Sequence, residues 1–378
     1  MMNEEKVTKR QAIILIILSR LSISISTMPT IDIPPYNQDM WIVVILSAFY
    51  STILVLPLLF LANRFVDYNL IGYMEVIYGK TLGKTLGIAY VLFFSFSSVI
   101  AAFNHVDLIG STILTNSMNG LLIAGLGVTA IYTVSRGLIV RLRAVEIFGP
   151  VAISTIIILV ILGIKESDFS SLFPILSDST LSDIHSGALQ LSFYSVDILL
   201  LAMIVPDLED KKDINNIFFI SIITSKLILV LAVIVTQAML GLEQSRHTNF
   251  PFNLYVRMIK FPNILERIDV VFILTWLITS QARVNGFLYL AVRGLREILN
   301  KGLKEKRIVI IMGILFSVIT FILTNRYPFN LIRSQLVKIH KPMFLIFIII
   351  IPIITCIVYL FRRRSIDQGQ RLLKNKGE

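Results

Sequence analysis

The chain has 378 residues, of which 55% are hydrophobic and only 16% are charged, and its mean hydropathy is +0.79. This composition excludes a soluble globular domain of this size and is typical of an all-α, polytopic membrane protein. The net charge of +11 does not indicate a nucleic-acid partner, because the basic residues follow a membrane topology. The lone cysteine, Cys356, can form no intrachain disulfide.

Apolar segments long enough to cross a bilayer, which takes about 20 helical residues, recur along the whole chain. We predict ten of them, at 11–29, 41–61, 86–109, 121–134, 145–164, 189–206, 214–240, 265–292, 308–324 and 343–361. The first has no cleavage signal, so we expect it to be retained as a span. We therefore expect one transmembrane domain over 1–378, which ends in a basic cytoplasmic tail at 363–378.

The loop charges predict the orientation of the spans. With the N-terminus in the cytoplasm, 23 lysine and arginine residues fall inside and nine outside, as the positive-inside rule requires. Ten spans then place both termini in the cytoplasm. The spans divide as five plus five, and the first and sixth start on opposite sides, which is the arrangement of an inverted repeat. We place the repeats at approximately 9–164 and 186–362.

The first span carries an unusual run of hydroxyl side chains. Ser22, Ser24 and Ser26 alternate with aliphatic residues and lead to Thr27, a period of two in a segment that should be helical in lipid. We expect this stretch to unwind and to turn its hydroxyls toward a cavity. The alternative is that the serines bond back to carbonyls of their own helix.

Arg20 precedes these serines and lies too deep to reach the interface easily. It needs an acidic partner or an aqueous pocket, and the candidate acids are Asp197, Glu146 and Asp269. Glu146 opens the fifth span, where it joins a cytoplasmic gate with Arg141 or Arg143 or is a plain interfacial charge.

The third span ends with His105 and Asp107, which point to different helix faces and which we expect to be solvated near the outer interface. The four histidines do not cluster, and no catalytic motif is present. We predict no catalytic residue, no metal site and no cofactor, and thus no enzyme.

The sixth span is almost wholly apolar, yet it contains Asp197 near its middle, just after Phe193 and Tyr194. At about 1.5 Å rise per residue, the carboxylate lies roughly 15 Å deep, where a charge costs at least about 2.5–3.5 kcal/mol. Such a group usually faces a cavity and has a function there. The alternative is a neutral acid, or one paired with Lys226 or Arg283.

The seventh and eighth spans carry further charges. Asp269, Trp276 and Arg283 are spaced seven residues apart, so they share one face of a helix. This stripe belongs inside the bundle, where it either lines a solute path or ties helices together. Lys226 in the seventh span forms an ion pair in the core or takes part in transport.

Five stretches in fixed order resemble the spore germination permeases that form the B subunit of germinant receptors (the GerAB/GerKB type), within the amino acid–polyamine–organocation transporter superfamily. Arg267, Asp269 and Trp276, an R-x-D motif followed by tryptophan, are the most family-like feature. The stretches run from TKRQAIILIILSR to FPFNLYVRMIKFPNILERIDVVFILTWLI and lie at 8–20, 39–49, 79–90, 172–208 and 250–278.

This resemblance implies ten membrane helices in a LeuT-like 5+5 inverted repeat, in the inner membrane of dormant spores. It also implies a receptor A subunit and a lipoprotein C subunit as partners, besides membrane lipids, and a small nutrient such as an amino acid as ligand. Relatives often have a Gly-rich turn in the first helix for the substrate carboxylate, whereas residues 22–27 contain no glycine. Asp197 matches a carboxylate common in the sixth span, and it could bind the ligand's ammonium group.

We therefore predict a receptor subunit that binds its germinant between the first and sixth spans. The rival functions are an ion- or proton-coupled amino-acid transporter and a structural subunit with a vestigial site. The predicted ligand-binding residues are Ser22, Ser24, Ser26, Thr27, Phe193, Tyr194, Asp197 and Trp276. The predicted gating or ion-pair residues are Arg20, Glu146, Lys226, Asp269 and Arg283.

Overall fold

The structure is a computed structural model that describes residues 6–27, 33–112, 119–260, 268–299 and 305–375. Within these ranges the chain is helical apart from short links and one isolated bridge between Val7 and Leu208. The α-helices are α1 (Lys9–Thr27), α2 (Met40–Arg64), α3 (Leu70–Tyr78), α4 (Lys80–Thr112), α5 (Asn119–Ser135), α6 (Gly137–Leu162), α7 (Leu181–Ser192), α8 (Ile198–Ile204), α9 (Ile214–His247), α10 (Pro251–Met258), α11 (Asp269–Ile298), α12 (Glu305–Arg326), α13 (Phe329–Phe344) and α14 (Ile351–Asn375).

Seven stretches of the described chain are long and apolar enough to cross a membrane. They are formed by α2, α4, α6, α9, α11, α12 and the continuous segment from α13 through a π-helical turn, Leu345–Ile350, into α14. The other three predicted spans correspond to α1, the shorter α5, and the pair α7 and α8. The all-α membrane architecture is confirmed, whereas the count of ten crossings and the two repeat boundaries stay predictions.

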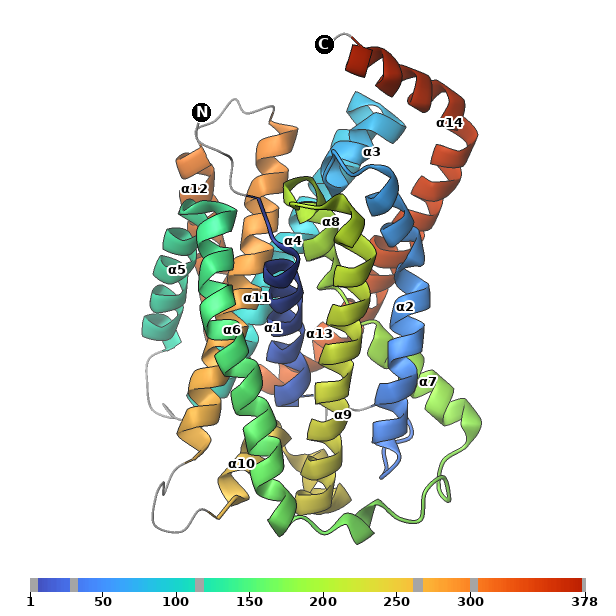
Figure 1. Ribbon diagram of the computed structural model, residues 1–378. Coiled ribbons are helices and arrows are strands. Elements are labelled where there is room, and N and C mark those ends of the chain that lie inside the picture. The colour runs from blue at the N-terminus through green and yellow to red at the C-terminus, as the bar shows by residue number, and fades with distance from the viewer. Residues whose placement is uncertain (1–5, 28–32, 113–118, 261–267, 300–304, 376–378) are drawn as a thin grey trace.

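The first helix lies at the centre of the bundle. From Gln11 to Ile25 its described side chains are buried or half-buried, and α1 packs against α6, α9 and α11 (Figure 1). A Cβ atom added at Gly149 of α6 would lie 2.2 Å from the Cγ2 atom of Ile14, so glycine permits this close approach. The centre of the protein is thus a helix whose polar groups must find partners inside the bundle.

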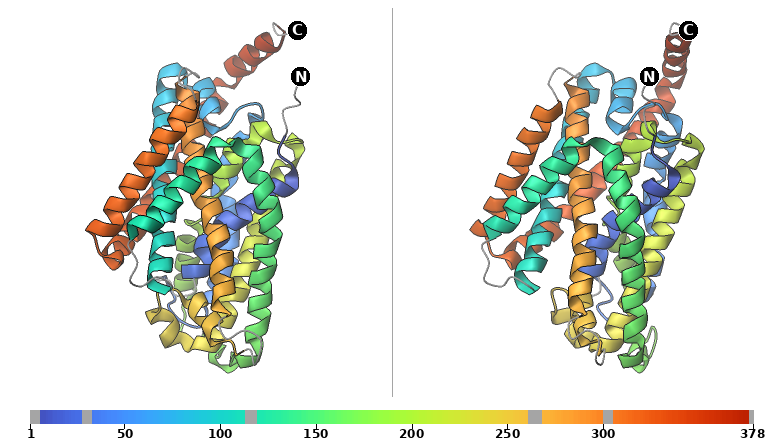
Figure 2. Two further views of the ribbon diagram at one scale, coloured as in Figure 1. Left: turned by 90° about the vertical axis from the view of Figure 1, so that its left-hand side faces the viewer. Right: turned by 60° about the vertical axis from the view of Figure 1, so that its left-hand side comes forward.

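The outer helices expose apolar side chains, as contact with lipid requires. Ile147, Phe148 and Val151 on α6 are more than half exposed, and long rows of isoleucine on α12 and α14 are exposed as well. The described ends of the chain lie toward the same end of the bundle (Figures 1 and 2). This agrees with an even number of crossings, while the compartment in which the ends lie stays a prediction.

The expectation of an unwound first span is wrong for the described residues. The α1 helix runs unbroken from Lys9 to Thr27. The hydroxyl of Ser22 donates to the carbonyl of Ser19 at 3.0 Å, which is the back-bonding alternative. A period of two in serine residues therefore did not break the helix, and the Ser22 hydroxyl is satisfied without unwinding.

The sixth span, in contrast, is interrupted. A capping box between Thr180 and Asp183 starts α7, which ends at Ser192, and α8 begins only at Ile198. The five residues between the two helices form turns around Ser195. The interruption places the Ser195 hydroxyl and the Asp197 carboxylate beside the unbroken α1.

Candidate functional site

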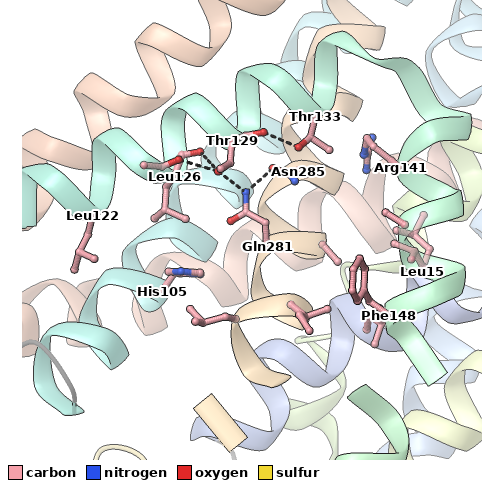
Figure 3. Close-up of a pocket in the computed structure, with 17 residues that line it drawn as sticks. Leu15, His105, Leu122, Leu126, Thr129, Thr133, Arg141, Phe148, Gln281 and Asn285 are labelled. Carbon is pink, nitrogen blue, oxygen red and sulfur yellow. Dashed lines mark hydrogen bonds between the residues drawn. The ribbon is translucent and has the colours of Figure 1, made fainter. Parts of the chain in front are cut away.

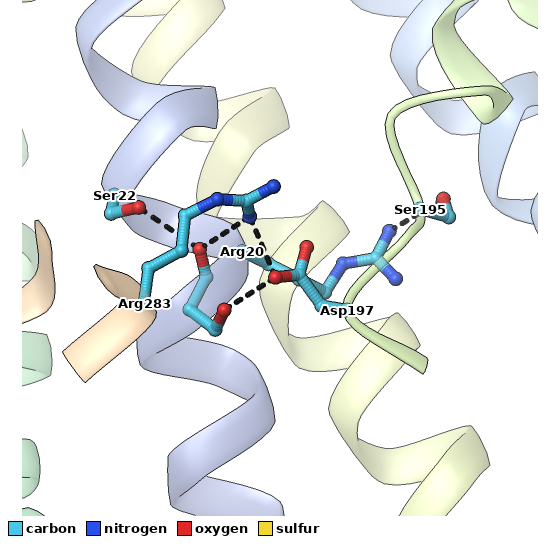
Figure 4. Close-up of polar contacts among 6 residues, drawn as sticks. Arg20, Ser22, Ser195, Asp197 and Arg283 are labelled. Carbon is cyan, nitrogen blue, oxygen red and sulfur yellow. Dashed lines mark hydrogen bonds and ion pairs between the residues drawn. The ribbon is translucent and has the colours of Figure 1, made fainter. Parts of the chain in front are cut away.

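Asp197 is the last residue of the interruption, and its carboxylate lies wholly inside the protein. Its Oδ1 atom accepts a hydrogen bond from Nη1 of Arg283 at 2.6 Å and another from the Ser19 hydroxyl (Figure 4). The same nitrogen of Arg283 donates to the Ser19 carbonyl at 2.9 Å. The pairing alternative with Arg283 is therefore the observed one, and added hydrogen bonds support it, as a buried ion pair requires.

The second oxygen of this carboxylate is different. Oδ2 of Asp197 is buried and has no hydrogen-bond partner among the described residues. A buried carboxylate oxygen that accepts nothing costs free energy, and in native proteins it calls for an explanation. It is a buried acceptor that no described residue uses.

Arg20 lies on the other side of the carboxylate but does not bond to it. Its Nη2 atom donates to the hydroxyl of Ser195 at 3.1 Å, and Ser195 shares a hydrogen bond of 2.9 Å with Ser51 (Figure 4). The interruption of the sixth span thus supplies both a serine for Arg20 and an acid for Arg283. None of the three acids proposed as a partner of Arg20 forms an ion pair with it in the described chain.

Lys226 adds a third basic group nearby. Its Nζ atom donates to the hydroxyl of Ser47 at 2.7 Å, and its side chain is buried. The ion-pair alternative for Lys226 is not observed among the described residues. Among the described residues, the buried region around α1 therefore holds Arg20, Lys226 and Arg283, and Asp197 is the one acid in contact with any of them.

Trp276 joins the site through the backbone of α1. Its Nε1 atom donates to the carbonyl of Ser22 at 2.7 Å, and its ring lies 5.3 Å from the ring of His105. Nδ1 of His105 is 2.8 Å from the hydroxyl of Ser280. His105 is only 5% exposed and Asp107 is buried too, so the expectation that they are solvated is wrong.

Two aromatic residues that were predicted to bind the ligand pack against other parts of the protein. Phe193 is buried against Phe344 of α13, with 5.3 Å between ring centroids. Tyr194 packs with the apolar cluster formed by α2, α7 and α9. Ser24 is half-buried, and the side chains of Ser26 and Thr27 lie outside the described part of the structure.

The remaining predicted charges have other partners: Asp269 begins α11, and Glu146 lies within α6. Asp269 is 3.9 Å from Nε of Arg257, and Glu146 accepts a hydrogen bond of 2.9 Å from Gln11. Asp269, Trp276 and Arg283 are all buried on the single helix α11, as their spacing of seven residues predicts. Only Arg283 of these three contacts Asp197.

The sequence reasoning missed the serines that complete the site. Ser19 bonds to both Asp197 and Arg283, and Ser195 accepts a hydrogen bond from Arg20 while it shares another with Ser51. Ser19 lies three residues before Ser22, so a helical period through the first span would have placed both on neighbouring positions. No pattern in the sequence indicates that Ser51 faces the interruption.

A pocket of about 560 Å³ lies elsewhere, between α1, α4, α5, α6 and α11 (Figure 3). Arg141, Gln281 and Asn285 are among its polar lining residues, and Leu15 and Leu18 belong to its apolar wall. Asp197 and the other predicted ligand-binding residues do not line it.

Comparisons with known proteins agree with this architecture. A family model described as "Spore germination protein" matches residues 6–329. The chain is 26% identical over 383 residues to spore germination protein KB of Bacillus subtilis (strain 168), covering 99% of this chain and all of that protein. It is 20% identical to spore germination protein GerQB of Bacillus cereus, covering 88% of this chain and 90% of that protein.

Solved structures show the fold. A substrate-bound, outward-open Na⁺-coupled sialic acid symporter matches with a TM-score of 0.65 and 13% identity, over 90% of this chain and 78% of that one. The inward-facing conformation of Mhp1 matches with a TM-score of 0.59 and 15% identity, over 96% and 78%. The predicted LeuT-like transporter fold is thus confirmed, and the relatives point to a membrane receptor or transporter rather than an enzyme. This multi-pass membrane protein belongs to the spore germination protein family.

Proposed function

We propose that the protein is the B subunit of a germinant receptor and binds a small zwitterionic nutrient, such as an amino acid, around Asp197. The family match and the transporter fold support the receptor role. The single observation that carries the site is a fully buried acid with an unpartnered oxygen, next to more basic groups than it can neutralise. A zwitterion has an ammonium group that can donate to the acid and a carboxylate that can accept from the basic groups.

The charges assign an orientation to the nutrient. Its ammonium group donates to Oδ2 of Asp197, and its carboxylate accepts from Arg20, whose one hydrogen bond among the described residues goes to the Ser195 hydroxyl. Guanidinium and carboxylate form charge-assisted hydrogen bonds, which are roughly twice as strong as neutral ones. The side chain of the nutrient extends toward Trp276, whose ring lies beside α1.

In this proposal the nutrient acts by changing the Asp197–Arg283 ion pair. The pair ties the interruption of the sixth span to α11 and, through the Ser19 carbonyl, to α1. A ligand that binds Asp197 competes with Arg283 and so favours a second arrangement of these helices. A ligand shifts such an equilibrium only by its difference in affinity for the two states. A and C subunits in the inner spore membrane then respond to the shift.

A second candidate is a coupled transporter, because the fold is shared with a Na⁺-coupled symporter. The oxygen atoms of Ser19 and Asp197 are of the kind that a small cation prefers. In this protein the guanidinium of Arg283 already occupies them, which favours the receptor. Uptake of labelled amino acids into liposomes, with and without Na⁺ or proton gradients, distinguishes the two: gradient-driven accumulation would support the transporter.

The test is a nutrient dose–response of spores that carry Asp197→Asn, with a panel of amino acids as germinants. We expect the half-maximal concentration to rise at least tenfold, while Asp207→Asn, which removes an acid paired with Arg293 outside the site, leaves it unchanged. Immunoblots compare the amounts of each variant in spores.

Arg20→Gln is a second variant that we expect to fold normally. Arg20 bonds to a serine, so its replacement leaves no buried acid without a partner. We expect Arg20→Gln spores to keep normal protein levels and yet to need at least tenfold more nutrient. An unchanged half-maximal concentration in both Arg20→Gln and Asp197→Asn spores would place the nutrient elsewhere.

A further inference from the structure

The pocket of about 560 Å³ opens sideways between α5 and α6. These helices meet at the turn around Arg136 and diverge away from it (Figure 2). Gly125 and Thr129 on α5, and Ala144 and Phe148 on α6, line the pocket and are exposed at its mouth. Because the outer face of α6 is apolar and more than half exposed, this mouth faces the bilayer and not the aqueous phase.

Arg141 lies at one end of the pocket, one turn into α6, and is only 4% exposed (Figure 3). Its guanidinium lies over the ring of Tyr289, 4.6 Å from the centroid, and its Nη1 atom has no hydrogen-bond partner in the described chain. A buried cation needs an anion or a full set of hydrogen bonds. The protein supplies an aromatic face and leaves one donor unused, so the missing partner is an acceptor from outside.

The rest of the lining combines two amides, Gln281 and Asn285, with many aliphatic side chains. Nε2 of Gln281 donates to Thr129 at 3.0 Å and to Oδ1 of Asn285 at 3.1 Å (Figure 3). Leu122 lies at the end opposite Arg141. The volume falls in the range of about 300–1,000 Å³ that is usual for small-molecule sites.

We propose that this pocket binds a membrane phospholipid with an anionic headgroup. The headgroup phosphate accepts from Nη1 of Arg141, and one acyl chain enters between α5 and α6 and extends toward Leu122. An arginine at the end of an apolar pocket fits this chemistry, since the phosphate is held near the interface and the chain stays in an apolar medium. The site is separate from the one proposed for the nutrient, because Asp197 does not line it.

The test is native mass spectrometry of the purified full chain with added phosphatidylglycerol or phosphatidylcholine of the same acyl chains. We expect phosphatidylglycerol to bind, phosphatidylcholine to bind at least tenfold more weakly, and Arg141→Ala to reduce phosphatidylglycerol binding at least tenfold. The control is Arg136→Ala, which removes an exposed arginine from the same end of α6. Glycerol phosphate, which has no chain, should not displace the lipid.

A second pair of variants tests the acyl chain while Arg141 stays in place. Gly125 lines the pocket, and a Cβ atom there meets nothing within 4 Å, so Gly125→Leu adds a side chain at the pocket wall. We expect this variant to bind phosphatidylglycerol at least tenfold more weakly, and Ala124→Leu, an exposed neighbour outside the lining, to bind normally. Equal binding by wild type, Arg141→Ala and Gly125→Leu, or displacement by glycerol phosphate alone, would overturn the proposal.

Discussion

Arg283 on α11 and Arg141 on α6 are almost equally buried, 5% and 4% exposed, yet their surroundings differ. Arg283 contacts a carboxylate and a backbone carbonyl of α1. Arg141 contacts an aromatic ring and keeps an unused donor beside an open pocket. Burial alone therefore does not tell what a charge in a membrane protein does. The groups that contact the charge show whether the protein itself satisfies it or whether a bound molecule is needed.

Adjacent residues on α1 and on α11 face different sites. On α1, Leu18 lines the pocket while Ser19 bonds to Asp197, and on α11 Ala282 lines the pocket next to Arg283. Successive residues of a helix point about 100° apart, so the same two helices serve both sites. Variants that remove one arginine at a time should therefore change the stability of the protein in opposite directions at the two sites.

Arg283→Met should have the largest effect, because it leaves Asp197 buried without its cation. Breaking a buried ion pair from one side typically destabilises a protein by about 3–5 kcal/mol. The double variant Arg283→Met/Asp197→Leu should recover most of this loss, since it removes both charges. Thermal unfolding of the purified protein in detergent measures both. If the double variant is no more stable than the single one, the pair does not hold these helices together.

Arg141→Met should have the opposite sign in lipid-free detergent. It removes a buried donor that has no partner, and such a group costs about 1–3 kcal/mol, so the melting temperature should rise. Added phosphatidylglycerol should then stabilise the wild type but not the variant, because only a folded state that binds a ligand gains stability from it. Arg136→Met serves as the exposed control and should change neither value. A fall in melting temperature without lipid would show that Arg141 is satisfied within the chain.

The sequence predicted the fold class well because the bilayer imposes it. Apolar runs of about 20 residues can only be helices there, and each predicted segment corresponds to a helix or to the pair α7 and α8. Asp197 and Arg283 were recognisable because a charge in an apolar run must have a partner, and Arg283 was one of two candidates for it.

The contacts between helices were not predictable from the chain. His105 was expected to be solvated because depth was inferred from its place in the span, whereas burial is decided by Ser280 and Trp276 on α11. Arg141 was expected at a cytoplasmic gate, whereas it is buried against the ring of Tyr289 on α11. The serines of α1 were over-interpreted, since back-bonding satisfies Ser22 without any unwinding. Position along a span does not determine which neighbouring helix a side chain faces.

Trp276→Phe tests how far the ion-pair site depends on the position of α1. The variant keeps most of the buried ring but leaves the Ser22 carbonyl without the hydrogen bond from Nε1. The carbonyl remains within the unbroken helix α1, so the variant loses one hydrogen bond, which should cost about 0.5–1.5 kcal/mol and lower the melting temperature by a few degrees. Trp41→Phe, on the half-buried start of α2, provides the matched control and should have a smaller effect. Equal effects of the two substitutions would mean that the indole N–H does not hold α1.

Lys226→Met should have the smallest effect, although it also removes a buried charge from the neighbourhood of Arg20. Lys226 contacts no acid in the described chain, and methionine follows a similar path with an unbranched side chain. Ser47 is not stranded, because its hydroxyl still donates to the Val44 carbonyl at 2.7 Å. We expect the free energy of unfolding to change by less than about 1 kcal/mol, since no ion pair is broken, and nutrient sensitivity to stay within twofold. A stable Lys226→Met protein that no longer responds to nutrient would instead make the lysine part of the site, as a second group for the nutrient carboxylate or a relay for protons. In that case the buried basic residue with an acidic partner, Arg283, would contribute mainly to stability. The buried basic residues without one among the described residues, Arg20 and Lys226, would contribute mainly to nutrient binding.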